Sequence, residues 1–484
     1  MNTATFSLAT VAPAIPEIAL LAFVSALLVI DLFVKESERH LTFWLAIASL
    51  LGTAVLAGSI AGSASAVTFQ GMFVADPMSQ VLKVAVLLSS AVTLVYGRVY
   101  LQDRELLRGE FLSLALFATL GMMVMISAHH FLTLYLGLEL LALSLYAMVA
   151  LQRESVRATE AAMKYFVLGA LASGMLLYGM SMLYGATGSL DIARVAASLG
   201  SAHSSQSLAV FGLVFVVAGI AFKLGAVPFH MWIPDVYHGA ATPATLFIGA
   251  APKIAAFAFV MRLLAHALGG MGADWQLMLA ILAAASIGLG NVVAIAQTNL
   301  KRMLAYSTIS HMGFLLLGIL AGTDNGYASA MFYVLTYVLM TLGAFGMILL
   351  LSRAGFEAEE LEDFRGLNRR SKWYAFVMLV VVFSLAGIPP TVGFLAKLSV
   401  LQAAFEAGFG YLVVFAVLMS VVGAFYYLRL VKLMYMDEPA GTITIAPRAD
   451  MRVLLSVNAL AVLGLGVVPA PLMDLCARAI TASL

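Results

Sequence analysis

The chain has 484 residues, of which 63% are hydrophobic and 11% charged, and its mean hydropathy is +1.01. Soluble globular proteins carry about a quarter charged residues, so this composition excludes a water-soluble fold and indicates a membrane protein. The net charge of +1 excludes nucleic-acid binding as the main role. The single cysteine, Cys476, excludes an internal disulfide and a four-cysteine iron–sulfur site.

Apolar segments follow one another along the whole chain. A membrane-spanning helix needs about 20 mostly apolar residues, and residues 1–10 lack the basic start of a cleaved secretory signal, so we expect the first segment to be a true span. The pattern predicts an all-α polytopic membrane protein with about 14 transmembrane helices. These spans are 14–34, 41–61, 77–97, 111–127, 130–151, 160–185, 206–233, 242–267, 275–297, 301–320, 326–352, 373–405, 408–435 and 453–474.

The basic residues predict how the chain is oriented, because cytoplasmic loops are enriched in lysine and arginine. Only Arg194, Arg262 and Arg478 belong to the connections after even-numbered spans. We therefore expect both termini on the periplasmic side. The basic residues after odd-numbered spans are Lys35, Arg39, Arg98, Arg104, Arg108, Arg153, Arg157, Lys164, Lys301, Arg302, Arg353, Arg365, Arg369, Arg370, Lys372, Arg429, Lys432, Arg448 and Arg452.

Glu139 lies near the centre of span five, and Lys223 near the middle of span seven. Burial favours the neutral form of both side chains, whereas an opposite charge favours the ionised form. A Glu139–Lys223 pair would therefore be a two-state element that releases a proton when it opens. The alternative is an ion pair that only fastens two helices together. Lys83, near the outer end of span three, is expected to extend to the interface.

Span seven contains Pro228, and its helix is predicted to break there. Proline lacks the N–H that would bond four residues back, so Pro228 frees the carbonyl of Leu224. Freed backbone groups are tolerated in a membrane only where they are buried in protein or line a wet cavity. Beyond the break, His230, Asp235 and His238 are either a proton entrance or a hydrated loop.

Three later spans carry further candidates. Lys253 is predicted near the middle of span eight and has no carboxylate partner within its span. His311 in span ten is a candidate relay residue, although a role in helix packing is equally compatible with its position. Tyr333, Thr336 and Tyr337 recur at helical spacing on span eleven, where they line the same path or pack the helices.

Span twelve contains Pro389 and Pro390, which free the carbonyls of Leu385 and Ala386, and Lys397 follows this second break. The breaks lie five spans apart, so their helices run in opposite directions, which predicts two inverted five-helix repeats. Transporters place ion paths at such broken helices. The predicted divisions are 1–110 (spans one to three), 111–267 (first repeat), 275–436 (second repeat) and 437–484 (a loop and span fourteen).

The mid-membrane charges are Glu139, Lys223, Lys253 and Lys397, and each costs about 2.5–3.5 kcal/mol on insertion scales. Four unpaired charges would cost roughly 10–14 kcal/mol, which is comparable to the stability of a whole domain. They must therefore face the bundle interior, find partners or meet water, and we predict that they translocate protons.

Besides the charges, five segments (160–169, 222–237, 301–307, 363–367 and 386–394) resemble the subunit N family of bacterial NADH–quinone oxidoreductase (respiratory complex I) and its antiporter-like relatives. The segment around Lys223 is shared by the broader antiporter family, whereas lysine at position 397 and the chain length favour subunit N. Because the sequence ends ten residues after span fourteen, we expect no long lateral helix of the kind that the longest antiporter-like subunit has.

By this resemblance, Glu139 and Lys223 match the family's conserved pair, Lys253 its central lysine and Lys397 its exit-side lysine. The resemblance implies a proton-translocating membrane-arm subunit of the bacterial inner membrane, beside other antiporter-like subunits and lipids. No phosphate loop or zinc motif is present, so no cofactor or metal is expected in this chain. NADH, FMN, iron–sulfur clusters and quinone are expected in other subunits.

Two alternatives remain open. A subunit of a multi-component sodium/proton antiporter would have similar spans and lysines. A membrane scaffold would use the buried charges only to lock helices together.

Overall fold

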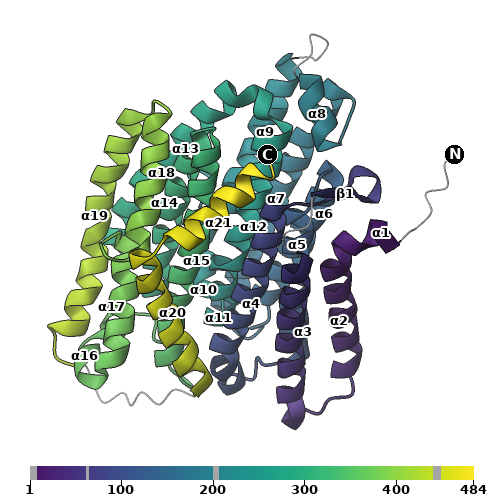
Figure 1. The fold of residues 1–484 in the computed structure, drawn as a ribbon. Coiled ribbons are helices and arrows are strands. Elements are labelled where there is room, and N and C mark those ends of the chain that lie inside the picture. Colours follow the sequence, from purple (N-terminus) through teal and green to yellow (C-terminus); the bar gives the residue numbers. More distant parts are fainter. Residues whose placement is uncertain (1–7, 61–64, 200–205, 440–448) are drawn as a thin grey trace.

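The computed structural model describes residues 8–60, 65–199, 206–439 and 449–484. Within these ranges, thirteen helices are long and apolar enough to cross a membrane, and they pack side by side in one bundle (Figure 1). The remaining predicted span, span twelve, consists of two shorter helices with a break between them, so the prediction of an all-α membrane protein is confirmed. Arg448 and most of residues 1–10 lie outside the described residues.

The long helices follow the order of the predicted spans, and two short strands and several short helices lie between them. The first half contains α1 (Leu8–Val11), α2 (Ile15–Asp31), α3 (Arg39–Ile60), β1 (Ala66–Thr68), β2 (Phe73–Ala75), α4 (Pro77–Asp103), α5 (Gly109–Ile126), α6 (Phe131–Val149), α7 (Val156–Thr187), α8 (Ile192–Leu199), α9 (Gln206–Leu224), α10 (Trp232–Gly239), α11 (Thr242–Gly249) and α12 (Ala251–Val260). The second half contains α13 (Gly272–Ile295), α14 (Leu300–Leu320), α15 (Asp324–Leu351), α16 (Leu367–Arg370), α17 (Lys372–Ala386), α18 (Val392–Glu406), α19 (Gly410–Tyr435), α20 (Ala449–Val467) and α21 (Ala470–Thr481).

Polar side chains fix where several spans begin. Asp76 and Ser79 form a reciprocal capping box at the start of α4, and Ser155, Asn299 and Thr323 cap α7, α14 and α15. Each cap satisfies a backbone N–H that has no partner within the helix. The caps therefore place the helix starts near the ends of the apolar segments.

Three local features differ from the expectations. Residues 66–75 form a short antiparallel hairpin, β1–β2, in the connection before α4. Predicted span eight is itself divided, because α11 ends at Gly249 and α12 restarts with Pro252 in its first turn. Predicted span fourteen ends at Val467 instead of residue 474, because the chain turns before Pro469 and continues as α21.

The two ends of the bundle differ in charge. In Figure 1, α16 and the connection between α2 and α3 lie at the lower end, where the sequence places Lys35, Arg39 and Arg369. Helix α21 runs across the bundle and packs against α15 and α4 (Figure 1).

Candidate functional site

The two broken helices end in the same way. Helix α9 ends at Leu224 and is followed by Gly225 at φ +81°, and helix α17 ends at Ala386 and is followed by Gly387 at φ +85°. In both, the glycine N–H and the next N–H bond back to the last turn of the helix, as in a Schellman cap. Positive φ favours glycine because a Cβ would be strained there. The predicted breaks are confirmed.

A lysine binds the last carbonyl of each broken helix. Lys253 Nζ donates to the Leu224 carbonyl at 2.9 Å, and Lys397 Nζ donates to the Ala386 carbonyl at 2.9 Å. Both oxygens are among those that the prolines were predicted to free. The carboxyl end of a helix carries partial negative charge, so each carbonyl suits a cation. The partners of these lysines are therefore backbone oxygens at helix ends.

Each lysine also lies against an aromatic ring. Lys253 Nζ is 5.6 Å from the ring centre of Trp232, and Lys397 Nζ is 5.1 Å from that of Phe314. The face of an aromatic ring attracts a cation, so each ring helps to stabilise the charged amine. The two breaks are therefore alike in backbone conformation, in the lysine they bind and in the ring beside it, although the lysines come from different helices.

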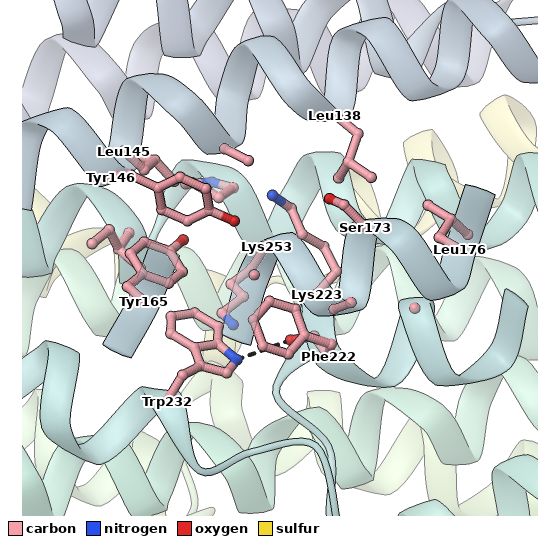
Figure 2. Close-up of a pocket in the computed structure, with 16 residues that line it drawn as sticks. Leu138, Leu145, Tyr146, Tyr165, Ser173, Leu176, Phe222, Lys223, Trp232 and Lys253 are labelled. Atoms are coloured by element: carbon pink, nitrogen blue, oxygen red, sulfur yellow. Dashed lines mark hydrogen bonds between the residues drawn. The ribbon is translucent and has the colours of Figure 1, made fainter. Parts of the chain in front are cut away.

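Lys223 and Lys253 line one cavity together with Ser173, Tyr146 and Trp232. Figure 2 shows Lys223 and Lys253 in this cavity, with the Lys253 amine on the side of Trp232. The cavity gives the two amines a shared space at the broken end of α9.

Glu139 and Lys223 do not form a direct ion pair within the described part of the chain. Ser173 Oγ instead donates to the Glu139 carboxylate at 2.5 Å, and Glu139 and Lys223 interact electrostatically without touching. Glu139 is half-buried, at the edge of a face of α6 where Leu136 and Leu143 are exposed. Sequence reasoning missed Ser173, for which the only signal was a polar residue within an apolar span.

His311 is buried among tyrosines. Its Nδ1 is 2.6 Å from the Tyr333 hydroxyl and its Nε2 is 3.3 Å from the Tyr427 hydroxyl, which also contacts Ser307 Oγ at 2.5 Å. His311 also interacts electrostatically with Lys397. The predicted relay histidine therefore belongs to a hydrogen-bonded cluster.

Of the three residues predicted together on span eleven, two reach this cluster. Tyr333 contacts His311, and the Tyr337 ring centre lies 5.1 Å from that of His311. Within the described part of the chain, Thr336 bonds only the backbone carbonyls of Phe332 and Tyr333 in its own helix.

The polar residues after the first break remain at the end of the bundle. Asp235 accepts from Lys164 at 2.8 Å and from Arg302 at 2.9 Å. Burial alone would raise the pKa of the Asp235 carboxyl, but its bonds to Lys164 and Arg302 outweigh burial and hold the pKa below its usual value. Asp235 therefore stays ionised and fastens α10 to α7 and α14.

The expectation for Lys83 was wrong. Its side chain is 3% exposed, and Nζ is 2.5 Å from Glu17 of α2, which is also buried. Lys83 does not extend to the interface because Glu17 neutralises it inside the protein. A second buried pair joins Asp76 to Arg262 at 2.7 Å, and neither pair was found from the sequence.

Among the described residues, no group of three or more His, Cys, Asp or Glu side chains is arranged to hold a metal ion. The arrangement of these residues is instead a series of amines, hydroxyls and one imidazole that can each carry or pass a proton. The roles assigned to Glu139, Lys223, Lys253, His311 and Lys397 remain predictions.

Comparison with known proteins gives consistent results. Residues 128–423 match the family described as NADH:quinone oxidoreductase/Mrp antiporter, TM. The chain is 63% identical to NADH-quinone oxidoreductase subunit N of Thiobacillus denitrificans, over 99% of both chains. It is 59% identical to the subunit N of Nitrosomonas europaea, over 99% of this chain and 100% of the other.

Solved structures have a similar fold. A chain of respiratory complex I from Thermus thermophilus with bound aureothin has a TM-score of 0.82 and 32% identity, and the match covers 95% of this chain and 99% of the other. A chain of the Mrp complex from Dietzia sp. has a TM-score of 0.83 at 20% identity, covering 98% and 97%, which shows a shared fold alone.

Proposed function

The chain belongs to the NADH:quinone oxidoreductase/Mrp antiporter transmembrane family, and we propose that it translocates protons as a membrane-arm subunit of NADH–quinone oxidoreductase. Quinone reduction elsewhere in the complex would supply the energy. The observation that carries the proposal is the pair of lysines, Lys253 and Lys397, each bound to the last carbonyl of a broken helix.

A lysine at such a carbonyl can work as a proton switch. The charged ammonium is stabilised by the carbonyl dipole, whereas a neutral amine loses most of that attraction. When a conformational change in the complex weakens this contact, burial favours the neutral form and the lysine releases its proton. Restoring the contact favours uptake of another proton.

The proposed path joins the two repeats. Glu139, positioned by Ser173, sets the charge state of Lys223, and Lys223 shares its cavity with Lys253. His311 and its tyrosines would carry the proton toward Lys397 at the second break. A direct Glu139–Lys223 contact would form in another state of the cycle.

The surroundings follow from the family. We propose a bacterial inner-membrane location with both termini on the periplasmic side, because the loops rich in lysine and arginine gather at the opposite end. The division into repeats 111–267 and 275–436, after 1–110 and before 437–484, belongs to the same proposal. Neighbouring antiporter-like subunits and lipids would cover the sides, and NADH, FMN, iron–sulfur clusters and quinone would lie in other subunits.

Substitution of the lysines tests the proposal. In the assembled complex, Lys223→Ala and Lys397→Ala should leave assembly intact and lower proton pumping and coupled NADH oxidation by at least about tenfold, because positioned proton donors typically contribute 10²–10⁴-fold. Pumping is measured as the pH change in sealed membrane vesicles after addition of NADH.

Lys432→Ala is the matched control, because Lys432 is exposed at the end of α19 and lies away from both breaks. Normal pumping and turnover in both test variants would rule the proposal out. Assembly defects with normal pumping per electron in whatever complex forms would support the scaffold alternative.

A further inference from the structure

A cluster of charged side chains lies at the basic end of the bundle, outside the path described above. Arg157 Nη1 donates to Glu359 at 3.0 Å, and His238 Nε2 is 3.9 Å from the same carboxylate oxygen. The Arg157 side chain is 58% exposed, so water reaches this cluster. Burial raises the pKa of Glu359, but Lys301, His238 and Arg157 outweigh it and hold the pKa below its usual value, so the carboxylate stays charged and attracts cations.

Lys301 lies on the inner side of the cluster. It is 2% exposed, and its Nζ is 3.4 Å from Glu359 and 3.7 Å from Glu357. The same amine donates to the Ala240 carbonyl at 3.1 Å and to Thr242 Oγ1 at 3.4 Å. Lys301 therefore connects the wet cluster to the turn between α10 and α11.

Tyr237 of α10 is fully buried, and its hydroxyl has no hydrogen-bond partner among the described residues. Thr308 of α14, which packs against α10, is among the polar groups near this hydroxyl. Burying a hydroxyl without a hydrogen-bond partner costs free energy, so an unpaired buried hydroxyl calls for an explanation. A role in proton transfer to the nearby Thr308 hydroxyl would supply one.

Hydroxyl groups continue from Thr308 to Tyr337, whose ring neighbours His311. The Tyr337 hydroxyl donates to Thr308 Oγ1 at 2.8 Å, and the Tyr337 ring lies beside His311. A small cavity at this place is lined by Ser307, Thr308, Tyr337 and Thr341, among others. Polar groups thus occur at intervals from the cluster at the basic end to the histidine of the second repeat. Among the described residues no hydrogen bond joins Lys301 to the Tyr237 hydroxyl or the Tyr337 hydroxyl to His311, so water would bridge these two steps.

We propose that the second repeat has its own proton entrance, which runs from Glu359 and Lys301 through Tyr237, Thr308 and Tyr337 to His311. The inference rests on the proposed function and adds a route to it, since the cavity at Lys223 lies in the first repeat. Thr308 Oγ1 donates to the Leu304 carbonyl and accepts from Tyr337, so transfer toward His311 requires both hydroxyls to rotate. Each hydroxyl then accepts one proton on the side of the cluster and releases its own toward His311, so no charge is left on the hydroxyls. A proton leaving the Lys301 ammonium is replaced from water at the cluster.

Thr308 provides the sharpest test. Thr308→Val keeps the shape of the side chain and removes the hydroxyl, and it should lower the initial rate of proton pumping in vesicles by about tenfold. Thr308→Ser keeps the hydroxyl and should pump at the wild-type rate. All variants are measured in the assembled complex with NADH as donor.

Thr336→Val is the matched control, because Thr336 is also fully buried and bonded to a carbonyl one turn back, but it hydrogen-bonds no relay hydroxyl among the residues that the structure describes. It should pump normally. Should Thr308→Val fail to assemble, Tyr337→Phe, which removes only the hydroxyl that donates to Thr308, decides the question with the same expected loss. Wild-type pumping in Thr308→Val or in Tyr337→Phe, or equal loss in Thr308→Val and Thr308→Ser, would overturn the inference.

The outcome is distinguishable from failure of the proposed function. If only the entrance is wrong, Lys223→Ala and Lys397→Ala lose pumping while the Thr308 variants retain it. If the chain does not translocate protons, all of these variants pump as the wild type does.

Discussion

At the scale of single residues, the energetic cost of burying Lys253 and Lys397 is met by a specific partner. A hydrogen bond to a charged group contributes about 1.5–3 kcal/mol, which is similar to the insertion cost of about 2.5–3.5 kcal/mol for one lysine. For Lys253 and Lys397 the partner is a backbone carbonyl. Because the terms nearly cancel, a small movement at either break can change which protonation state is favoured.

The Glu17–Lys83 pair, in contrast to Lys253 and Lys397, joins two opposite charges and is expected to stabilise the fold. Both side chains are almost fully buried at a separation of 2.5 Å, in α2 and α4. Removing one charge from a buried pair leaves the other uncompensated, which costs about 3–5 kcal/mol. We expect Glu17→Gln to lower the melting temperature of the purified complex and the amount of assembled subunit.

Glu36→Gln serves as the control, because Glu36 is exposed between α2 and α3. The double variant Glu17→Leu with Lys83→Met should restore most of the stability, since apolar side chains of similar volume replace both charges. If Glu17→Gln is as stable as the wild type, the pair does not hold α2 against α4. A stable double variant with unaltered pumping would also place the pair outside the proton path.

At the scale of elements, the two helix breaks provide the backbone carbonyls that bind Lys253 and Lys397. Each needs a glycine at positive φ directly after the helix, followed three residues later by a proline, as at Gly225 and Pro228 and at Gly387 and Pro390. This arrangement leaves the last carbonyl without an N–H partner in its own helix. The lysine amines then occupy the positions that an amide would take in a continuous helix.

Gly387→Ala tests this arrangement. A Cβ at Gly387 would lie 2.9 Å from Lys397 Cδ, so the lysine side chain must move away from the Ala386 carbonyl. We expect the variant to assemble and to lose pumping and coupled turnover by about tenfold, as for a displaced proton donor.

Gly408→Ala is its control. Gly408 also has positive φ, at +91°, so alanine there carries the same backbone strain of about 1–2 kcal/mol. A Cβ at Gly408 meets nothing within 4 Å. Equal loss in both variants would show that strain, and not the position of Lys397, is responsible.

At the scale of the whole molecule, the exposed apolar faces show that the chain is built to stay in a membrane beside other proteins or lipid. The side chains of Val156, Leu171, Phe211, Tyr411 and Val421 are all more than 60% exposed. Apolar surface of this extent is stable only against lipid or a partner protein.

Copurification identifies the assembly. A tagged copy of this chain, extracted in mild detergent, should bring with it flavin- and iron–sulfur-containing subunits, seen by mass spectrometry and by their visible absorption. If the tagged chain instead brings only other membrane antiporter proteins, it belongs to a sodium/proton antiporter. The lysine variants then have to be tested for sodium-driven proton exchange.

The sequence alone determined the number of spans, the basic end of the bundle, the two breaks and the carbonyls freed there, because length, apolarity and proline act locally. Only the tertiary structure decided which groups meet these carbonyls. Lys253 lies 29 residues from Leu224, and nothing local connects them. The Glu17–Lys83 pair, Ser173 beside Glu139 and the hydroxyls between Lys301 and His311 likewise depend on how helices distant in sequence pack, which local patterns do not encode.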